Sequence, residues 1–188
     1  DGELFILQTR NAKRTAQASV KIAVDMHNEK ILSKQEAINM IDADQITSVL
    51  HPQFVDSDNK KLFEKGLNAS PGAAVGEIVF DPEKAEIEAA RGKKVILVRD
   101  ETSPEDISGM FASVGILTTK GGMTSHAAVV ARGMGKPCIV GAENLKIDKN
   151  DRKISNGQIT VEEGDLISLD GSTGEIFLGE VELESAKL

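Results

Sequence analysis

Gly121-Gly122-Met123-Thr124-Ser125-His126 is followed at once by the apolar run Ala127-Ala128-Val129-Val130-Ala131. The glycines interrupt regular structure, and the small apolar residues after them predict a helix that begins at His126. A short apolar run, Gly115–Thr118, predicts a strand just before the glycines. Because strand, glycine turn and helix follow one another in this order, the stretch favours an α/β fold.

The start of this helix is a suitable place for phosphate chemistry. Free backbone N–H groups and the positive end of the helix dipole attract an anion, and Gly121 and Gly122 let the backbone approach it closely, with the hydroxyls of Thr124 and Ser125 nearby. The same field disfavours a charged imidazolium, so His126 is expected in its neutral, nucleophilic form. No base, metal set or acyl pocket accompanies it, which favours phosphorylation of the ring. A histidine that merely caps the helix is the alternative.

The charge distribution around His126 differs from that of the whole chain. The net charge is −8, yet residues 112–142 contain no Asp or Glu, only Lys120, Arg132 and Lys136. The 30 acidic residues among 188 would place about five in a stretch of this length if they were evenly spread. An anion-tolerant patch explains this absence. A buried strand–helix–strand unit, from which acids are excluded in any case, also explains it.

Gly121–Gly135, with Lys136-Pro137 after it, closely resembles the phosphohistidine motif of phosphoenolpyruvate (PEP)-utilising enzymes. Three further segments resemble the family in the same order, so the resemblance spans nearly the whole chain: Leu7–Asn11 with Lys13-Arg14-Thr15, Ala69–Ala74 and Glu101–Asp106. Related synthases and sugar-transport phosphotransferases usually carry Arg where Met123 stands, and synthases commonly carry Cys where Ser125 stands. These two residues therefore favour the dikinase branch of the family.

The resemblance implies a three-layer β/β/α swivelling phosphohistidine domain over residues 67–180, preceded by a mostly helical segment. It implies that residues 1–51 are the C-terminal remnant of an ATP-grasp nucleotide-binding domain, that 52–66 are a linker, and that 181–188 begin a linker to a PEP/pyruvate barrel domain. These two domains are the expected partners. The full enzyme is expected to be a homodimer that uses ATP as a substrate and needs Mg²⁺ bound outside this chain. The chain alone is not expected to turn over.

Carried over residue by residue, the resemblance makes His126 the phosphohistidine nucleophile. Thr124 matches a position at which some dikinases are regulated, so a regulatory kinase and phosphatase are further possible partners. Gln8 and Arg10 match positions that contact nucleotide phosphates, and the forked guanidinium of Arg10 suits phosphate oxygens. No metal ligand is expected on this chain.

Two other interpretations stay open. The first is the equivalent domain of PEP synthase or of sugar-transport phosphotransferase enzyme I, which Met123, Ser125 and the segment Gln8–Thr15 disfavour. The second is a non-catalytic interaction domain with the same fold, which the intact His126 and its leading glycines disfavour. The choice between inorganic phosphate and water as the second phosphate acceptor belongs to the ATP-grasp portion outside this chain.

The pattern along the first third of the chain predicts one strand and three helices. Leu4–Leu7 is a short apolar run, and Asn11 can cap a helix that ends near Asn28. Ser33 and Glu36 have the spacing of a capping box, which predicts a second helix, and a third is expected to end at Leu50. Further along, strands are expected over Ala74–Phe80, Val95–Val98, Gly115–Thr118, Cys138–Val140, Ile159–Val161, Leu166–Leu169 and Glu175–Leu178, and helices over Glu83–Ala90, from Pro104 and from His126.

Composition excludes several functional classes. The net acidity, the absence of Trp and Tyr and the presence of only six Phe argue against a nucleic-acid binder. No apolar run approaches the roughly 20 residues that span a bilayer, so no membrane partner is expected. The single cysteine, Cys138, indicates a reducing intracellular compartment, cytoplasmic by default. Because Ala186-Lys187-Leu188 resembles a peroxisomal address, an organelle such as a plastid, glycosome or peroxisome is the alternative.

Overall fold

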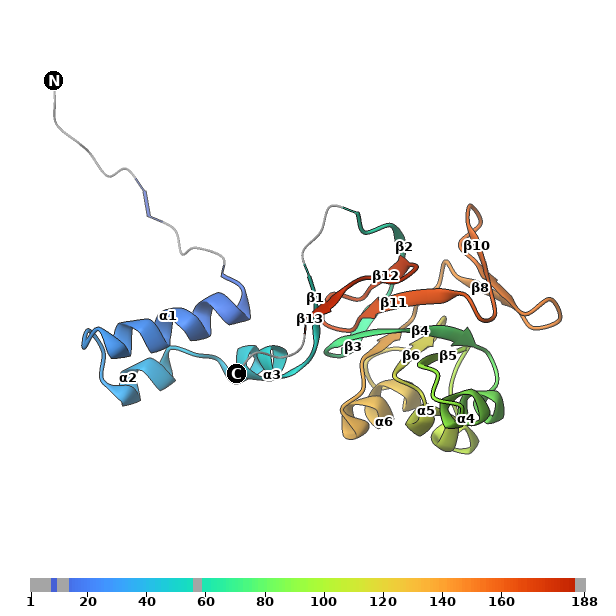
Figure 1. Cartoon of the computed structure of the whole chain (residues 1–188), viewed down its shortest axis with the longest axis horizontal. Coiled ribbons are helices and arrows are strands. Elements are labelled where there is room, and N and C mark those ends of the chain that lie inside the picture. Colours follow the sequence, from blue (N-terminus) through green and yellow to red (C-terminus); the bar gives the residue numbers. More distant parts are fainter. Residues whose placement is uncertain (1–7, 10–13, 56–58, 185–188) are drawn as a thin grey trace, which may run out of the picture. The chain divides into compact units, whose positions relative to one another are not determined.

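The computed structural model describes residues 8–9, 14–55 and 59–184 (Figure 1). The chain forms two compact units, which we call the helical unit (Asp1–Val49) and the sheet unit (Leu50–Leu188). The strand expected over Leu4–Leu7, the cap expected at Asn11 and the terminal Ala186-Lys187-Leu188 lie outside the described residues.

The helical unit contains α1 (Ala16–Asn28), α2 (Lys34–Asn39) and α3 (Ala43–Leu50). The first helix begins later than expected, because the hydroxyl of Thr15 accepts a hydrogen bond of 3.2 Å from the backbone N–H of Ala18 and so caps α1. The capping box before α2 is confirmed. The Glu36 N–H donates to Ser33 Oγ at 3.3 Å, and the Ser33 N–H donates to the Glu36 carboxylate at 2.8 Å.

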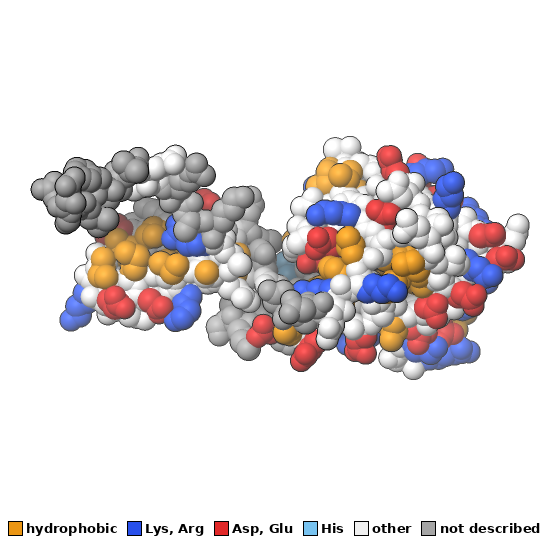
Figure 2. Space-filling view, turned by 90° about the horizontal axis from the view of Figure 1, so that it is seen from above, with side chains coloured by type: hydrophobic (Ala, Val, Ile, Leu, Met, Phe, Trp, Pro, Cys, Tyr) orange, Lys and Arg blue, Asp and Glu red, His pale blue; other side chains and the backbone are white. Residues whose placement is uncertain are grey.

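An apolar groove lies between α1 and α2. It has a volume of about 210 Å³, and Val24 and Ile38 on its walls are 49% and 54% exposed. Figure 2 shows hydrophobic side chains gathered in a band over these helices. Among the described residues of this unit only Ala23 and Ala37 are buried hydrophobics, so the helices by themselves enclose little core.

The sheet unit is built on one eight-stranded sheet. Its strands, in the order in which they pair, are β2 (Leu62–Lys65), β12 (Glu175–Leu178), β11 (Leu166–Asp170), β4 (Ala73–Val79), β5 (Val95–Arg99), β6 (Gly115–Thr118), β7 (Cys138–Val140) and β3 (Leu67–Ser70). The four strands from β4 to β7 run parallel, and the other pairs are antiparallel. Parallel neighbours need crossover connections, and helices supply them here.

Three crossovers cover one face of the sheet. They are α4 (Pro82–Ala90), a short 3₁₀ turn η1 (Pro104–Asp106) that continues into α5 (Ile107–Ala112), and α6 (His126–Met134). Figure 1 shows the three α-helices together on the same side. The helix expected from Pro104 therefore starts as a 3₁₀ turn and becomes α-helical at Ile107.

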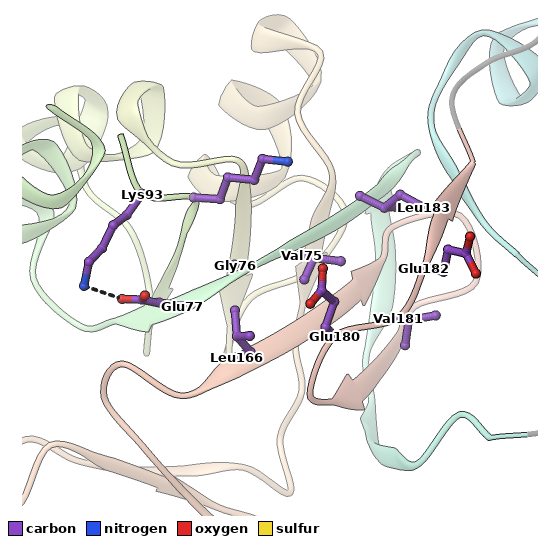
Figure 3. Close-up of a pocket in the computed structure, with 10 residues that line it drawn as sticks. Val75, Gly76, Glu77, Lys93, Leu166, Glu180, Val181, Glu182 and Leu183 are labelled. Carbon is purple, nitrogen blue, oxygen red and sulfur yellow. Dashed lines mark hydrogen bonds and ion pairs between the residues drawn. The ribbon is translucent and has the colours of Figure 1, made fainter. Parts of the chain in front are cut away.

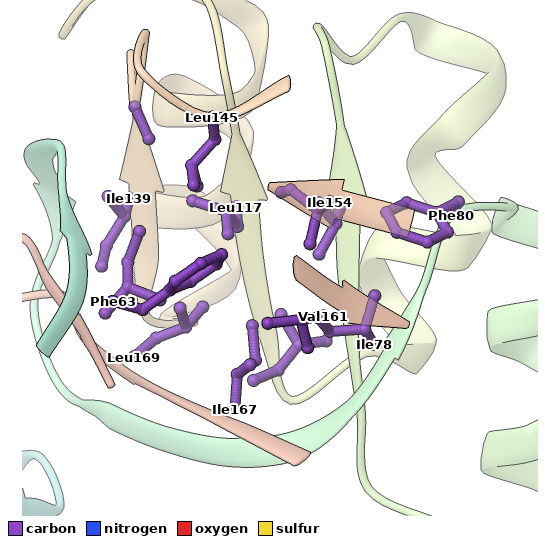
Figure 4. Packing of buried hydrophobic residues seen from close by; sticks show 14 residues of the cluster. Phe63, Ile78, Phe80, Leu117, Ile139, Leu145, Ile154, Val161, Ile167 and Leu169 are labelled. Atoms are coloured by element: carbon purple, nitrogen blue, oxygen red, sulfur yellow. The ribbon is translucent and has the colours of Figure 1, made fainter. Parts of the chain in front are cut away.

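A small antiparallel sheet covers part of the other face. It consists of β8 (Lys146–Asp148), β9 (Lys153–Ser155) and β10 (Thr160–Glu162). Ile154 and Val161 point from it toward residues of the main sheet such as Ile78 and Ile167 (Figure 4). The sheet unit therefore has β, β and α layers, and alternate residues of β5 enter different cores. Val95 and Leu97 pack with the helices, whereas Ile96 and Val98 pack with the small sheet.

Part of the expected linker 52–66 belongs to the sheet unit. β1 (Gln53–Phe54) pairs with β13 (Leu183–Glu184), and β2 pairs with β12 at the edge of the main sheet. Phe63 in β2 is only 3% exposed, and its burial explains why this charged stretch is held as a strand. β8 and β9 were also not expected, because most of their residues are polar and only the middle residue of each is apolar.

Candidate active site

His126 is the first residue of α6, as the sequence predicts. Ser125 caps the helix, and its Oγ accepts a hydrogen bond of 3.4 Å from the N–H of Ala128. The turn before it is set by Gly121, whose φ of +92° suits glycine, and by a 2.9 Å hydrogen bond from the Ser125 N–H to the Gly122 carbonyl. The backbone therefore fixes the histidine at the helix start, where an anion is favoured.

Thr102 is the direct partner of the histidine ring. Its Oγ1 lies 2.8 Å from Nδ1 of His126, and the residue is 9% exposed. It lies between β5 and η1, which the Ser103 N–H helps to cap by donating to the Asp106 carboxylate at 3.0 Å. Thr102 was not singled out from the sequence, and its only signal there was the resemblance of the segment Glu101–Asp106 to the family.

A cavity of about 260 Å³ opens beside the ring. Its lining comes from three places: Glu101 and Thr102 after β5, Thr118, Lys120 and Gly121 at the end of β6, and Ser125, His126 and Ala127 at the start of α6. The carboxyl ends of neighbouring parallel strands are where α/β sheets bind ligands. The strand order therefore brings the histidine and its partner threonine to such a place.

Acidic groups return to the site from outside the acid-free stretch 112–142. Glu101 lines the cavity itself. Hydrogen bonds from Ser103 and from its own backbone N–H lower the pKa of the Glu105 carboxyl in the same segment. The stretch is free of acids in sequence, but the site is not free of them in space.

Two of the three basic residues of the stretch 112–142 donate hydrogen bonds to backbone carbonyls. Arg132 donates to the carbonyl of Met123 and, at 3.1 Å, to that of Ala128, so it ties the glycine turn to α6. Lys136 donates to the carbonyls of Phe111 and Ser113 at the end of α5, and burial lowers its pKa. Both therefore serve the local structure.

The remaining predicted residues differ in their placement. Thr124 is exposed on the turn before the cap. Gln8 is exposed in the helical unit, and Arg10 lies outside the described residues. The structure brings Gly121, Ser125 and His126 together around the cavity.

A larger cavity, of about 620 Å³, lies elsewhere on the sheet unit (Figure 3). Figure 3 shows residues of β4, β11 and the segment after Gly179 around it, with the Lys93 ammonium 2.9 Å from the Glu77 carboxylate. Lys93 also pairs with Glu88 at 3.2 Å. None of the predicted site residues lines this cavity, so we assign the candidate site to the smaller cavity at His126.

No group of three or more His, Cys, Asp or Glu side chains in the described part of the chain is arranged to hold a metal ion. No helix within residues 8–9, 14–55 and 59–184 has the length and apolar character that crossing a bilayer requires.

Comparison with known proteins identifies the class. Residues 91–174 match the family model described as PEP-utilising enzyme, mobile domain. The chain belongs to the PEP-utilising enzyme family, as the motif around His126 predicts.

Sequence relatives narrow this class. The chain is 50% identical over 187 residues to pyruvate, phosphate dikinase of Rhizobium meliloti, covering 100% of this chain and 21% of that protein. It is 53% identical over 178 residues to chloroplastic pyruvate, phosphate dikinase 1 of Arabidopsis thaliana (94% and 18%) and 52% identical over 183 residues to the dikinase of Rickettsia prowazekii (97% and 21%). The chain thus spans about a fifth of the length of these relatives and resembles one segment of them.

A solved structure offers a weaker comparison. The solution NMR structure of Enzyme I matches with a TM-score of 0.34 at 29% identity, over 45% of this chain and 30% of that chain. This score is too low to compare the folds.

Proposed function

We propose that this chain is the phosphoryl-carrying segment of a pyruvate, phosphate dikinase. His126 would accept a phosphoryl group and carry it between an ATP/phosphate site and a pyruvate/phosphoenolpyruvate site. The observation that carries the proposal is the 2.8 Å contact between Thr102 Oγ1 and His126 Nδ1, beside an open cavity at the start of α6. The 50% identity to a dikinase over the full chain supports the assignment to this reaction.

The contact with Thr102 supports Nε2 as the ring nitrogen that reacts. When Nδ1 keeps its hydrogen and donates it to Thr102, the lone pair of the neutral ring lies on Nε2. This lone pair forms a bond to the phosphorus of the donor, while the bond from phosphorus to the donor's leaving oxygen breaks. Transfer to the acceptor reverses these changes. Backbone N–H groups at the helix start favour the negative charge of the phosphoryl group throughout.

A carrier must reach two other sites, which would be an ATP-grasp domain and a PEP/pyruvate barrel domain. The pairing of β1 with β13 supports this motion, because the first and last strands of the sheet unit are held side by side. The sheet unit can then rotate as a rigid body about a single hinge. Enclosing each reaction in a different partner domain keeps water away from the phosphoryl group.

We also propose a substrate, a metal, an oligomeric state, a regulator and a location for the full enzyme. ATP would be its substrate, with Gln8 and Arg10 among the contacts to nucleotide phosphates, and Mg²⁺ would be bound by another part of the protein. The proposal assigns no step to a metal ion on this chain. A homodimeric enzyme, a regulator that acts on Thr124, and a cytoplasmic or organellar location belong to the same proposal.

Phosphoryl transfer from the barrel domain tests the function. The chain would be mixed with a separately produced PEP/pyruvate barrel domain from a dikinase relative, Mg²⁺ and PEP labelled on phosphorus. We expect acid-labile, base-stable label on the chain and none on His126→Asn. If the folded wild-type chain stays unlabelled beside an active barrel, the carrier function is wrong and a non-catalytic interaction domain is favoured.

A further inference from the structure

Lys120 has a different position from the other two basic residues of the acid-free stretch 112–142. Arg132 and Lys136 are engaged with backbone carbonyls, as described above. Lys120 lines the His126 cavity, and within the described residues its ammonium group has no hydrogen bond or ion pair. It is therefore a cation beside the candidate nucleophile that the local structure does not use.

The backbone of Lys120 is firmly held although its side chain is exposed. Its N–H donates to the Asp100 carbonyl at 3.0 Å. Its carbonyl accepts from Thr118 Oγ1 at 2.7 Å and from the Gly141 N–H at 3.3 Å. These bonds fix the Cα at the end of β6, so the flexible side chain starts from a defined place at the cavity wall.

The charges around the cavity indicate what the ammonium group can do there. A phosphoryl group adds a charge of about −1.5 to −2 at neutral pH. Glu101 lines the same cavity. The start of α6 supplies only about half a positive charge. A further cation is needed to offset the charges of the phosphoryl group and of the Glu101 carboxylate, and Lys120 is placed to supply it.

We propose that the Lys120 ammonium group binds the phosphoryl group on His126. Its positive charge offsets the repulsion between the phosphoryl group and the Glu101 carboxylate. The inference rests on the proposed function, because it assigns a group that would hold the transferred phosphoryl. It adds no covalent step: the ammonium group forms charge-assisted hydrogen bonds to phosphoryl oxygens. Lys146 provides a matched control, since it lines the neighbouring cavity of about 460 Å³, which Lys120 also borders, but not the cavity at His126.

Chemical phosphorylation tests the contact without any partner domain. The chain would be treated with potassium phosphoramidate, and the phosphorus NMR signal that is missing in His126→Asn would be titrated with pH. We expect the second ionisation of the phosphoryl group in Lys120→Met to lie about 0.5–1 pH unit above that of wild type, because a nearby cation favours the dianion. Lys120→Arg and Lys146→Met should titrate like wild type.

Removing the opposing charge adds a readout that a purely structural role would not change. Glu101→Gln in the Lys120→Met background should move the midpoint back toward wild type, because repulsion from one carboxylate is removed. Equal midpoints in Lys120→Met and wild type would overturn the proposal, as would an equal shift in Lys146→Met.

The same variants distinguish this inference from the proposed function. With the barrel domain and labelled PEP, Lys120→Met should be labelled roughly 10–100-fold more slowly than wild type, and Lys120→Arg within about threefold. A midpoint shift in chemically phosphorylated chain without any labelling by PEP would support the Lys120 contact and contradict the carrier function. Labelling of wild type and Lys120→Met at equal rates would support the carrier function and contradict the role of Lys120.

Discussion

The hydroxyl of Thr102 lies 2.8 Å from Nδ1 of His126, although the two residues are 24 positions apart and belong to different crossovers of the sheet. In neutral imidazole one nitrogen donates and the other accepts, and we propose that the Thr102 hydroxyl accepts the Nδ1 hydrogen, which leaves the lone pair on Nε2. The threonine therefore acts as a positioning residue for the candidate nucleophile.

Loss of this hydroxyl should slow phosphorylation of His126. Thr102→Val keeps the shape of the side chain but removes the acceptor, and we expect labelling by PEP and the barrel domain to fall about 10–100-fold, because the tautomer and ring orientation are no longer held. Thr102→Ser should retain most of the rate. Nitrogen NMR of the ring should show less Nδ1–H tautomer in the valine variant. An unchanged tautomer ratio would contradict the positioning role.

The two glycines before the histidine should respond differently to alanine. A Cβ on Gly121 would lie 2.9 Å from the Cβ of Ser125 and would require φ near +92°, so we expect Gly121→Ala to lose about 1–2 kcal/mol of stability. A Cβ on Gly122 meets nothing within 4 Å, so Gly122→Ala should unfold within about 0.5 kcal/mol of wild type. Thermal and urea unfolding measure both.

The labelling rate of Gly122→Ala then tests how closely the phosphoryl donor approaches the backbone. If the donor passes over this glycine, the added methyl group should slow labelling of His126 while stability is kept. Wild-type labelling in this variant would show that the approach is from another side.

A negative charge at Thr124 should block phosphorylation. The side chain is exposed on the turn two residues before His126, so a substitution there should leave the fold intact. Thr124→Asp places a carboxylate where it repels an incoming phosphoryl group, and we expect labelling to become undetectable while the melting temperature is unchanged. Thr124→Asn, of equal size and without the charge, is the control. Full labelling of Thr124→Asp would refute the regulatory role.

Glu163 should make stability depend on pH under acidic conditions. Burial raises the pKa of this carboxyl, but hydrogen bonds from Arg152, Lys84 and the Phe80 N–H outweigh it and lower the pKa to about 2. The folded pKa lies below the unfolded value near 4.3, so the stabilisation is complete above that value and is lost as the pH falls toward about 2.

Substitution of Glu163 checks this linkage. Glu163→Gln should lose roughly 2 kcal/mol at pH 7, because the two cations lose a shared carboxylate that is 8% exposed. Its free energy of unfolding should also fall less steeply than that of wild type between pH 5 and 2. Glu162→Gln is a suitable control, because Glu162 is exposed and pairs only at 3.8 Å with Lys153 among the described residues. Parallel pH curves for wild type and Glu163→Gln would contradict the assignment.

Local features of the sequence predicted much of this fold. The capping box at Ser33 and the helix start at His126 were confirmed, because caps depend on interactions within a few residues. The strand Gly115–Thr118 was also confirmed, because a short apolar run indicates a buried strand. The start of α1 was wrong by several positions, since Thr15 was not recognised as the cap. Charged β2 was missed because its partner, β12, lies far away in the chain. Polar β8 was missed because only its middle residue is apolar, although its partner, β9, is close in sequence.

The sequence by itself determined the family, the α/β class and the position of His126 at a helix start. Only the tertiary structure decided which groups surround the ring. The parallel order of β5 and β6 brings Thr102, Glu101 and Lys120 to the same edge of the sheet, so that an apparently acid-free segment meets carboxylates from another loop. Periodicity and capping describe neighbours along the chain, whereas the charge and hydrogen bonding of this site depend on contacts between crossovers.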